Sequence, residues 1–543
     1  MSDRGFSLRA IVLIAVLAMV MVACGDDDTA DTTTIATTAD TTADTGQETA
    51  PETSTTTSEE SVPEDTPSVV RFGDEFKSES LDPDKASRAF ELVWLTPVYD
   101  TLIRTLPNGD LAPGLATSWE WIDATTFELQ LREGVLFHDG TPFDGEAVKK
   151  NLERTLTFEG TSARVRGSVE AIEVVEVIEP LRVRILLTEP SVGLPFNLAA
   201  LAGLMVSPAA LDGSTLDSSP VGTGPYVIAD YRPGDQAIYE RFDDHWDDAV
   251  DNRASRLEIV SMDAVARFNA LRSGQIDLAQ LEVRQVQEAE AAGFTVEIGD
   301  SLGVWVVHLN TARGPLTDPL VRTALNHMVD REAIVEQLAF GIGQATIQLF
   351  PPDYFGFNDS FDLAHFPYDP VRAADLLDQA GFPNGIDLEL LVLNRPDDVL
   401  LAELIQALFG ESGARIALRI VDPAEFRIYT EGDVDMMIGH FGGRPNPDET
   451  LDVFFGGGFF NPSDEISDGM ALLIAEAQGA IFGSAAYIQA VTEASGLGVE
   501  EALRVPLFIR SIPFAHDGCV GGFEPAIFGA QNATGLFILP ECR

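Results

Sequence analysis

The sequence predicts an α/β protein with two or three lobes, and three observations support this class. With 543 residues, the chain is too long for a single hydrophobic core. Short alternating strands and amphipathic helices are interleaved from residue 69 onward. At residues 386–422 a strand, a helix and a strand follow one another, which is typical of a βαβ unit and predicts a parallel strand pair. No period of roughly 20–50 residues recurs, so we do not expect a solenoid or propeller.

The charge of the chain limits its partners. The sequence has 87 acidic and 34 basic residues, which give a formal net charge of −53. Such a chain is repelled by the phosphates of nucleic acids and by anionic membrane surfaces. We therefore expect no nucleic-acid partner.

The N-terminus has the pattern of a secretory signal. Arg4 and Arg9 precede an apolar run that ends at Cys24 and is too short to span a bilayer comfortably. Cys24 follows Ala23 and resembles the lipobox of bacterial lipoproteins, although Met21 stands where that motif prefers Leu. We expect residues 1–24 to be a lipoprotein signal peptide, Cys24 to carry lipid, and the protein to be anchored on the outer face of the cell membrane. An uncleaved membrane anchor is the alternative.

A polar segment follows this signal. Residues 25–68 consist mainly of Thr, Asp, Glu, Ala and Pro, with twelve acidic residues and no Lys or Arg. Such a composition cannot bury enough apolar surface to offset the entropy lost on ordering. We predict a disordered acidic tether that holds the folded body near the membrane.

Alternating apolar residues predict two strands early in the body. Residues 126–132 place Phe127, Leu129 and Leu131 on one face, and residues 181–187 alternate in the same way. Between them, residues 146–156 space apolar side chains four apart after a Thr-Pro-Phe-Asp turn, which predicts the start of a helix.

Asp-Pro pairs predict where the later helices begin, because Asp caps free amides and Pro suits the first helical turn. One helix is predicted to begin at Asp318 and end at Gly341, and another to begin at Asp369 and end at Gly381.

The stretch SPVGTGPYVI at 219–228 contains a Gly-x-Gly that invites comparison with phosphate-binding turns. Those turns need further glycines and a helix directly behind them, whereas Pro225 follows Gly224 here and the next residues look like a strand. We therefore interpret the stretch as a rigid structural corner without a catalytic role.

Two cysteines remain near the C-terminus, Cys519 and Cys542. In an exported chain a disulfide between them is plausible, and two unpaired buried thiols are the alternative.

Several punctuated stretches, in order, resemble the extracellular solute-binding proteins of ABC importers, in the class that includes oligopeptide, dipeptide and nickel binders (solute-binding protein family 5). The resemblance runs from about Val69 to the end of the chain, with a weak patch near 465–500. The stretches that carry it are LDP (81–83), VYDTLIRTLPNGDLAPGLATSWEW (98–121), FELQLREGVLFHDGTPFDGEAV (127–148), PVGTGPYVI (220–228), RFNALRSGQIDLA (267–279), VVHLNT (306–311), DPLVRTALNHMVDREAIV (318–335) and YDPVRAADLLDQAGFPNG (368–385).

The resemblance implies a two-lobed, periplasmic-binding-protein-like (type II) fold with a hinge and an extra subdomain inserted in the first lobe. The implied divisions are a first lobe at 69–300 with its insert at about 100–205, a second lobe at 301–500, and a return to the first lobe at 501–543. The lobes are expected to close on a small-molecule or peptide ligand and then to dock on ABC permease subunits. No bond is made or broken, so we expect a monomeric binding protein rather than an enzyme, with no cofactor.

The loop after the strand at 434–441 bears on the ligand. In peptide-binding relatives an acidic residue in this loop pairs with the free ammonium of the ligand. Gly443 stands at that place here, and Arg444 follows. Arg444 favours an anionic group through charge-assisted hydrogen bonds, so a peptide held by its N-terminus is not expected. The alternative is that Arg444 only faces solvent.

The resemblance implies further ligand-binding residues, each with an alternative role in the core or on the surface. Trp305 is interpreted as hinge packing, and Phe459 is an alternative to Phe460 as a stacking partner. The remaining candidates are Glu79, Ser80, His440, Phe441, Phe460 and Asn461.

The sequence gives little support to metal binding or catalysis. Its seven histidines never fall three or four residues apart, and no H-E-x-x-H is present. No G-x-S-x-G elbow is present either. The alternatives to import are a ligand-sensing receptor on the same fold and, more remotely, an extracellular hydrolase.

Overall fold

The computed structural model describes residues 68–542, with gaps at 212–214, 248–252, 353, 458–459, 463–465 and 530. The predicted signal peptide, the lipidation site Cys24 and all of the tether but Ser68 lie outside the described residues.

The first lobe is built on a seven-stranded mixed sheet with the order β12-β19-β11-β1-β10-β9-β8. Its central strand β1 runs parallel to both of its neighbours, β10 and β11. The strands are β1 (Val69–Asp74), β8 (Tyr226–Arg232), β9 (Gln236–Arg241), β10 (Arg256–Ser261), β11 (Leu278–Gln280), β12 (Thr295–Gly299) and β19 (Ile512–His516).

A four-stranded antiparallel sheet, β4-β5-β7-β6, forms the inserted subdomain. Both strand predictions are confirmed, since Leu129 of β5 lies opposite Val183 of β7 and both side chains are fully buried. Two small ribbons, β2-β3 and β20-β21, complete the strands of this lobe. The bounds are β2 (Ile103–Thr105), β3 (Leu111–Pro113), β4 (Ala116–Asp123), β5 (Thr126–Leu131), β6 (Ile172–Glu179), β7 (Arg182–Leu187), β20 (Val520–Gly521) and β21 (Phe537–Ile538).

The second lobe contains a six-stranded sheet with the order β14-β18-β13-β17-β15-β16. The predicted βαβ unit is confirmed, because β15 and β16 pair in parallel on either side of a helix. Neighbouring residues such as Leu390 and Leu391 are buried in different clusters, so both faces of this sheet are covered. The strands are β13 (Val304–Leu309), β14 (Gln344–Ala345), β15 (Ile386–Leu393), β16 (Ala414–Val421), β17 (Met436–Phe441) and β18 (Arg504–Ile509).

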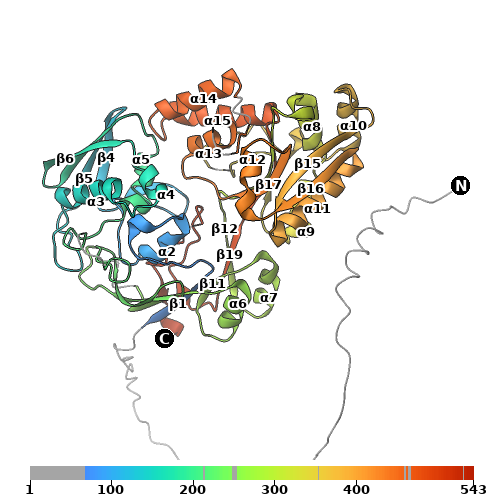
Figure 1. Ribbon diagram of the computed structural model, residues 1–543. Helices are drawn as coiled ribbons and strands as arrows, with labels where there is room; N and C mark the ends of the chain where they lie inside the picture. The colour runs from blue at the N-terminus through green and yellow to red at the C-terminus, as the bar shows by residue number, and fades with distance from the viewer. Residues whose placement is uncertain are drawn as a thin grey trace, which may run out of the picture. The chain divides into compact units, whose positions relative to one another are not determined.

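Helices cover the sheets of both lobes (Figure 1). Those of the first lobe are α2 (Leu92–Leu95), α3 (Gly145–Thr157), α4 (Ala163–Gly167), α5 (Leu194–Asn197), α6 (Ala264–Arg272) and α7 (Val286–Ala291). Those of the second lobe are α8 (Pro319–His327), α9 (Arg331–Leu338), α10 (Pro370–Gln379), α11 (Pro396–Glu411), α12 (Arg427–Thr430), α13 (Pro447–Phe455), α14 (Asp468–Gly479) and α15 (Ala485–Glu500).

Side-chain capping sets the helix boundaries and corrects one prediction. Asp144, Asp318 and Asp369 accept hydrogen bonds from the first turns of α3, α8 and α10, as the sequence indicates. The single helix predicted from Asp318 to Gly341 is wrong. The chain leaves the helical path after α8, and Asp330 caps a second helix, α9.

The chain passes between the two large sheets at two points. It leaves the first sheet after β12 and enters the second at β13, and it returns between β18 and β19. The return was expected at residue 501, but Arg504–Ile509 pairs with β13 as part of the second sheet. The crossing therefore lies at Arg510 and Ser511, because β18 must first complete the second sheet.

The corner at 219–228 packs on the backbone of residues 97–99. A Cβ on Gly222 would lie 2.1 Å from the carbonyl oxygen of Val98, so this approach requires glycine. The amide of Gly224 donates to the same carbonyl at 2.8 Å, and Tyr226 then begins β8. These contacts fit the interpretation of the stretch as scaffold.

The C-terminal segment is joined to itself by a disulfide between Cys519 and Cys542, whose Cα atoms are 5.7 Å apart. The amide of Leu539 also donates to the carbonyl of Cys519 at 2.8 Å. Together with the β20-β21 ribbon, these bonds tie the end of the chain to the first lobe.

Candidate functional site

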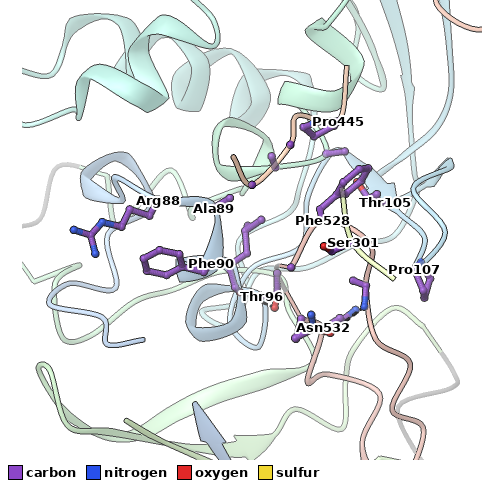
Figure 2. A pocket seen from close by; sticks show the side chains of 18 of the residues that line it. Arg88, Ala89, Phe90, Thr96, Thr105, Pro107, Ser301, Pro445, Phe528 and Asn532 are labelled. Atoms are coloured by element: carbon purple, nitrogen blue, oxygen red, sulfur yellow. Dashed lines mark hydrogen bonds between the residues drawn. The ribbon is translucent and has the colours of Figure 1, made fainter. Parts of the chain in front are cut away.

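A cavity of about 1130 Å³ lies between the two lobes, and both lobes line it. Figure 2 shows Phe90 and Thr96 of the first lobe around the pocket, with Pro445 of the second lobe above, Ser301 near the middle and Asn532 of the C-terminal return below. A volume of this order suits a drug-sized molecule. Most of the lining comes from residues 75–107, 164–200 and 522–535, the two crossings and the loop after β17, and single residues such as Arg253 and Phe460 add to it.

Four of the predicted ligand-binding residues line this cavity: His440, Phe441, Arg444 and Phe460. Phe441 meets the ring of Phe460 edge-on at 5.6 Å, so the two rings form a continuous apolar wall. Phe460 is also stacked on His308 at 4.2 Å. Phe459 lies outside the described residues.

His440 presents a neutral imidazole to the cavity. Burial lowers the pKa of His440 to about 3, and the positive charges of Arg510 and Arg395 add to this effect. Its ring lies 5.5 Å from that of Trp305, the opposite residue on β13. The Nε2 atom is buried next to Gly303 and has no hydrogen-bond partner among the described residues.

Three predicted site residues lie outside the cavity lining. Glu79 is exposed and pairs with Lys77 at 2.6 Å. The hydroxyl of Ser80 donates to Asp217, so it fixes the turn that follows β1. Asn461 is buried, and its amide donates to the carbonyl of Gly456 at 2.8 Å, where it holds the loop after α13.

Arginine is the main charged residue of the lining. Six arginines line the cavity against three carboxylates, in a chain whose net charge is −53. The arginines are Arg88, Arg104, Arg164, Arg253, Arg444 and Arg510. The carboxylates are Glu75, Asp100 and Glu524. Arginines therefore outnumber carboxylates on the lining, although Arg253 and Arg444 pair with carboxylates outside it.

One of these carboxylates, Asp100, is hydrogen-bonded and ion-paired to other residues of the protein. Asp100 accepts hydrogen bonds from Trp246 at 2.8 Å and Thr223 at 3.2 Å, and it pairs with Arg104 at 3.3 Å. Burial acts to raise the pKa of Asp100, but the hydrogen bond and charge of His245 together with these partners hold it below its usual value. Asp100 thus stays ionised and anchors Arg104 at the cavity wall.

The C-terminal return supplies a polar group that the sequence did not reveal. Gln531 is only 5% exposed, and its Oε1 accepts from the amide of Ala526 at 2.9 Å. Its Nε2 has no hydrogen-bond partner within the described part of the chain, and the residue lines the cavity. Residues 522–535 show neither helical nor strand periodicity, so no sequence signal marked them.

Within the described residues, no three His, Cys, Asp or Glu side chains are grouped so as to hold a metal ion. Among the helices that can be described, none is long and apolar enough to cross a bilayer.

A cavity lined by two α/β lobes that are joined by two crossing segments defines the class of two-lobed solute-binding proteins. The chain matches the model for bacterial extracellular solute-binding proteins, family 5 Middle, over residues 110–462, and it belongs to that family. It serves as the solute-binding component of an ABC importer, and its body therefore works outside the cytoplasm. The relatives it matches are binding proteins of transporters rather than enzymes.

Among curated proteins, the chain is 30% identical to heme-binding protein A of Haemophilus influenzae, covering 66% of this chain and 71% of that one. It is 28% identical to the glutathione-binding protein GsiB of Pectobacterium atrosepticum, covering 67% of this chain and 71% of that one. Among solved structures, HbpA2 from Haemophilus parasuis has a TM-score of 0.79 at 22% identity, over 87% of this chain and 100% of that one. The unliganded open form of the murein tripeptide-binding protein MppA has a TM-score of 0.78 at 18% identity, over 87% of this chain and 97% of that one.

Proposed function

We propose that the protein captures a small organic anion in the cavity between its lobes and delivers it to the permease unchanged. The observation that carries this proposal is the excess of arginine on the lining. Guanidinium groups recognise carboxylates and phosphates through paired, charge-assisted hydrogen bonds, and they do so most strongly where water is excluded. Heme and glutathione, for which two relatives are named, both carry carboxylates, which supports the same ligand chemistry.

The loop after β17 supports an anion over a peptide held by its ammonium group. Gly443 offers no carboxylate there, and its φ of +75° favours glycine at that position. The guanidinium of Arg444 follows directly and lines the cavity. A peptide-like ligand therefore binds through its C-terminal carboxylate or an acidic side chain.

The proposal includes the anchoring and assembly of the protein. Lipid on Cys24 holds a monomeric body near the membrane through the tether at 25–68, and the body carries out no covalent chemistry on the solute. Mass spectrometry of the mature N-terminus, with a Cys24→Ser control that loses the lipid, tests the anchor. Sedimentation of the full chain in detergent tests the monomer.

Native mass spectrometry of the protein, purified gently from its host, tests the ligand class. We expect a co-purifying organic molecule with at least one negative charge at neutral pH, and its mass should be the same before and after release. A tightly held cation or neutral sugar contradicts the proposed ligand class. A released product of altered mass contradicts the absence of catalysis.

A further inference from the structure

Arg164 and Arg444 come from opposite lobes and line the same cavity. Arg164 lies on the short helix α4 of the inserted subdomain, and Arg444 lies on the loop after β17 of the second lobe. The two segments belong to parts of the chain that meet. A Cβ on Gly193 would lie 2.0 Å from Nδ2 of Asn446, so the loop before α5 touches the loop that carries Arg444.

Further contacts place α4 at this junction. The amide of Asn197 on α5 donates to the carbonyl of Ser168 at 2.8 Å, which ties α5 to the end of α4. The ring of Phe196 meets that of Phe482, from the second lobe, at 4.5 Å. The helix of Arg164 is therefore fixed to the edge of the first lobe that approaches the second.

The charges at this junction do not balance. Arg444 pairs with Glu449 at 3.2 Å, and its guanidinium lies 5.7 Å from the centre of the Phe441 ring. Arg164 is an exposed residue at the cavity wall, and Glu449 is the only carboxylate among the described residues whose charge acts on it. Partial desolvation lowers the pKa of Arg164, the nearby charge of Arg444 lowers it further, and Glu449 partly opposes both. The charges of Arg164, Arg444 and Glu449 thus act on one another, and together they sum to one positive charge at this junction.

We propose that Arg164 and Arg444 form a latch between the lobes that a ligand anion closes. This inference rests on the proposed function. It adds that Arg164 and Arg444 hold the negative group of the ligand and that this contact closes the lobes. Without ligand, the two guanidinium groups repel and oppose the approach of the lobes. A carboxylate or phosphate placed between them supplies the missing charge, so it binds more strongly to the closed form than to the open one. A ligand shifts a conformational equilibrium only by such a difference in affinity.

Substitutions at Arg164 distinguish a residue that controls closure of the lobes from one that only contacts the ligand. Arg164→Gln removes the repulsion and one anion contact, so the unliganded protein should close more readily although anions bind less tightly. Arg164→Glu places a carboxylate opposite Arg444 and should close the lobes without any ligand. Arg427→Gln is the matched control, since that arginine on the second lobe has a side chain that is 76% exposed and, among the described residues, it forms an ion pair with Glu431 alone.

Amide hydrogen exchange of the full chain reads out closure, at residues 191–199 and 442–447 on the two sides of the junction. Without ligand, we expect protection there to increase in the order wild type, Arg164→Gln, Arg164→Glu, while Arg427→Gln matches wild type. Equal exchange in wild type and Arg164→Glu, with both variants melting like wild type, overturns the latch. Arg444→Glu provides a second test should Arg164→Glu fail to fold, and it should close the lobes in the same way.

Calorimetry with glutathione as the anionic probe distinguishes the two proposals. We expect Arg164→Gln and Arg444→Gln each to weaken binding about tenfold, the loss of one charge-assisted contact in a partly exposed site. Tight binding of glutathione that neither substitution changes contradicts the latch but leaves the anion-binding function intact. If the glutathione amide with no free carboxylate binds as tightly as glutathione itself, the proposed ligand class fails, while the exchange data on unliganded protein still decide the latch.

Discussion

Replacing Gly224 by alanine should destabilise the first lobe, because this residue touches the backbone of its neighbour. A Cβ at this position would lie 2.5 Å from the carbonyl carbon of Val98 and 2.7 Å from the amide nitrogen of Tyr99. Ordinary contact begins at 3.4 Å, so one backbone must move by about 0.7 to 0.9 Å in a closely packed interior.

The expected cost follows from the contacts that this movement disturbs. Forcing a methyl group into a packed core costs about 1–3 kcal/mol. Three hydrogen bonds are stretched as well, between Gly224 and Val98 at 2.8 Å, Tyr226 and Pro97 at 2.9 Å, and His138 and Gly224 at 2.9 Å. If all three are lost at a net value near 1 kcal/mol for each bond, the free energy of unfolding should fall by about 4–6 kcal/mol. For a cooperative unit of roughly 230 to 480 residues, that corresponds to a Tm lower by about 4–12 °C.

Thermal and urea unfolding of Gly224→Ala against wild type measure this cost. Gly410→Ala is the control, since a Cβ there has no neighbour within 4 Å and the residue lies inside α11. That substitution should be neutral or stabilising by up to about 1 kcal/mol, because alanine favours helix more than glycine does. If both variants have the Tm and the urea midpoint of wild type, the account of the corner as a close backbone contact is wrong.

Three further predictions concern stability and metals. Reduction of the Cys519–Cys542 disulfide, or its replacement by two serines, should lower the Tm, since the bond closes a loop with a sequence separation of 23 and such loops contribute about 3 kcal/mol; an unchanged melting curve contradicts this. Burial raises the pKa of Asp74 to about 6 at a residue that is 4% exposed. The folded state therefore binds its proton more tightly than the unfolded state does, so the free energy of unfolding should fall by up to about 3 kcal/mol as pH rises from about 4 to about 6 and stay level above. Asp74→Asn should flatten this slope in urea titrations between pH 4 and 7, and an equally steep slope in the variant refutes the assignment. Nickel chloride and EDTA should each leave the Tm unchanged, and a shift of several degrees with nickel would show a metal site.

The parts of the fold that the sequence predicts well are those defined by local patterns. The βαβ unit at 386–422 could be predicted because its strands, helix and turns each carry their own periodicity. The break between α8 and α9 was missed, since apolar spacing continues through Met328 and Val329 and only the cap at Asp330 interrupts it. The return crossing was placed too early, because strand pairing of residues 504–509 with β13 depends on distant residues.

The candidate site could be predicted only in the two stretches whose resemblance to relatives marks them. His440 and Phe441 end β17 and Arg444 follows it, while Phe460 belongs to the segment after α13. Arg88, Arg164 and Arg510 belong to separate segments, and nothing local distinguishes them from surface arginines. The resemblance places Glu79, just ahead of LDP, at a strand edge that touches ligands in relatives, but here its side chain is exposed and pairs with Lys77.

The two crossing segments lie side by side. β12 pairs with β19 and β13 pairs with β18, both antiparallel, and the amide of Arg510 donates to the carbonyl of Gly303 at 2.7 Å between them. A single strand would let one lobe swivel freely on the other, whereas two bonded strands bend together about one axis and resist twisting. The lobes thus have one easy route of approach. Ser301 and Arg510 belong to the two crossing segments, and both line the cavity. A molecule that fills the cavity therefore contacts the segments about which the lobes move.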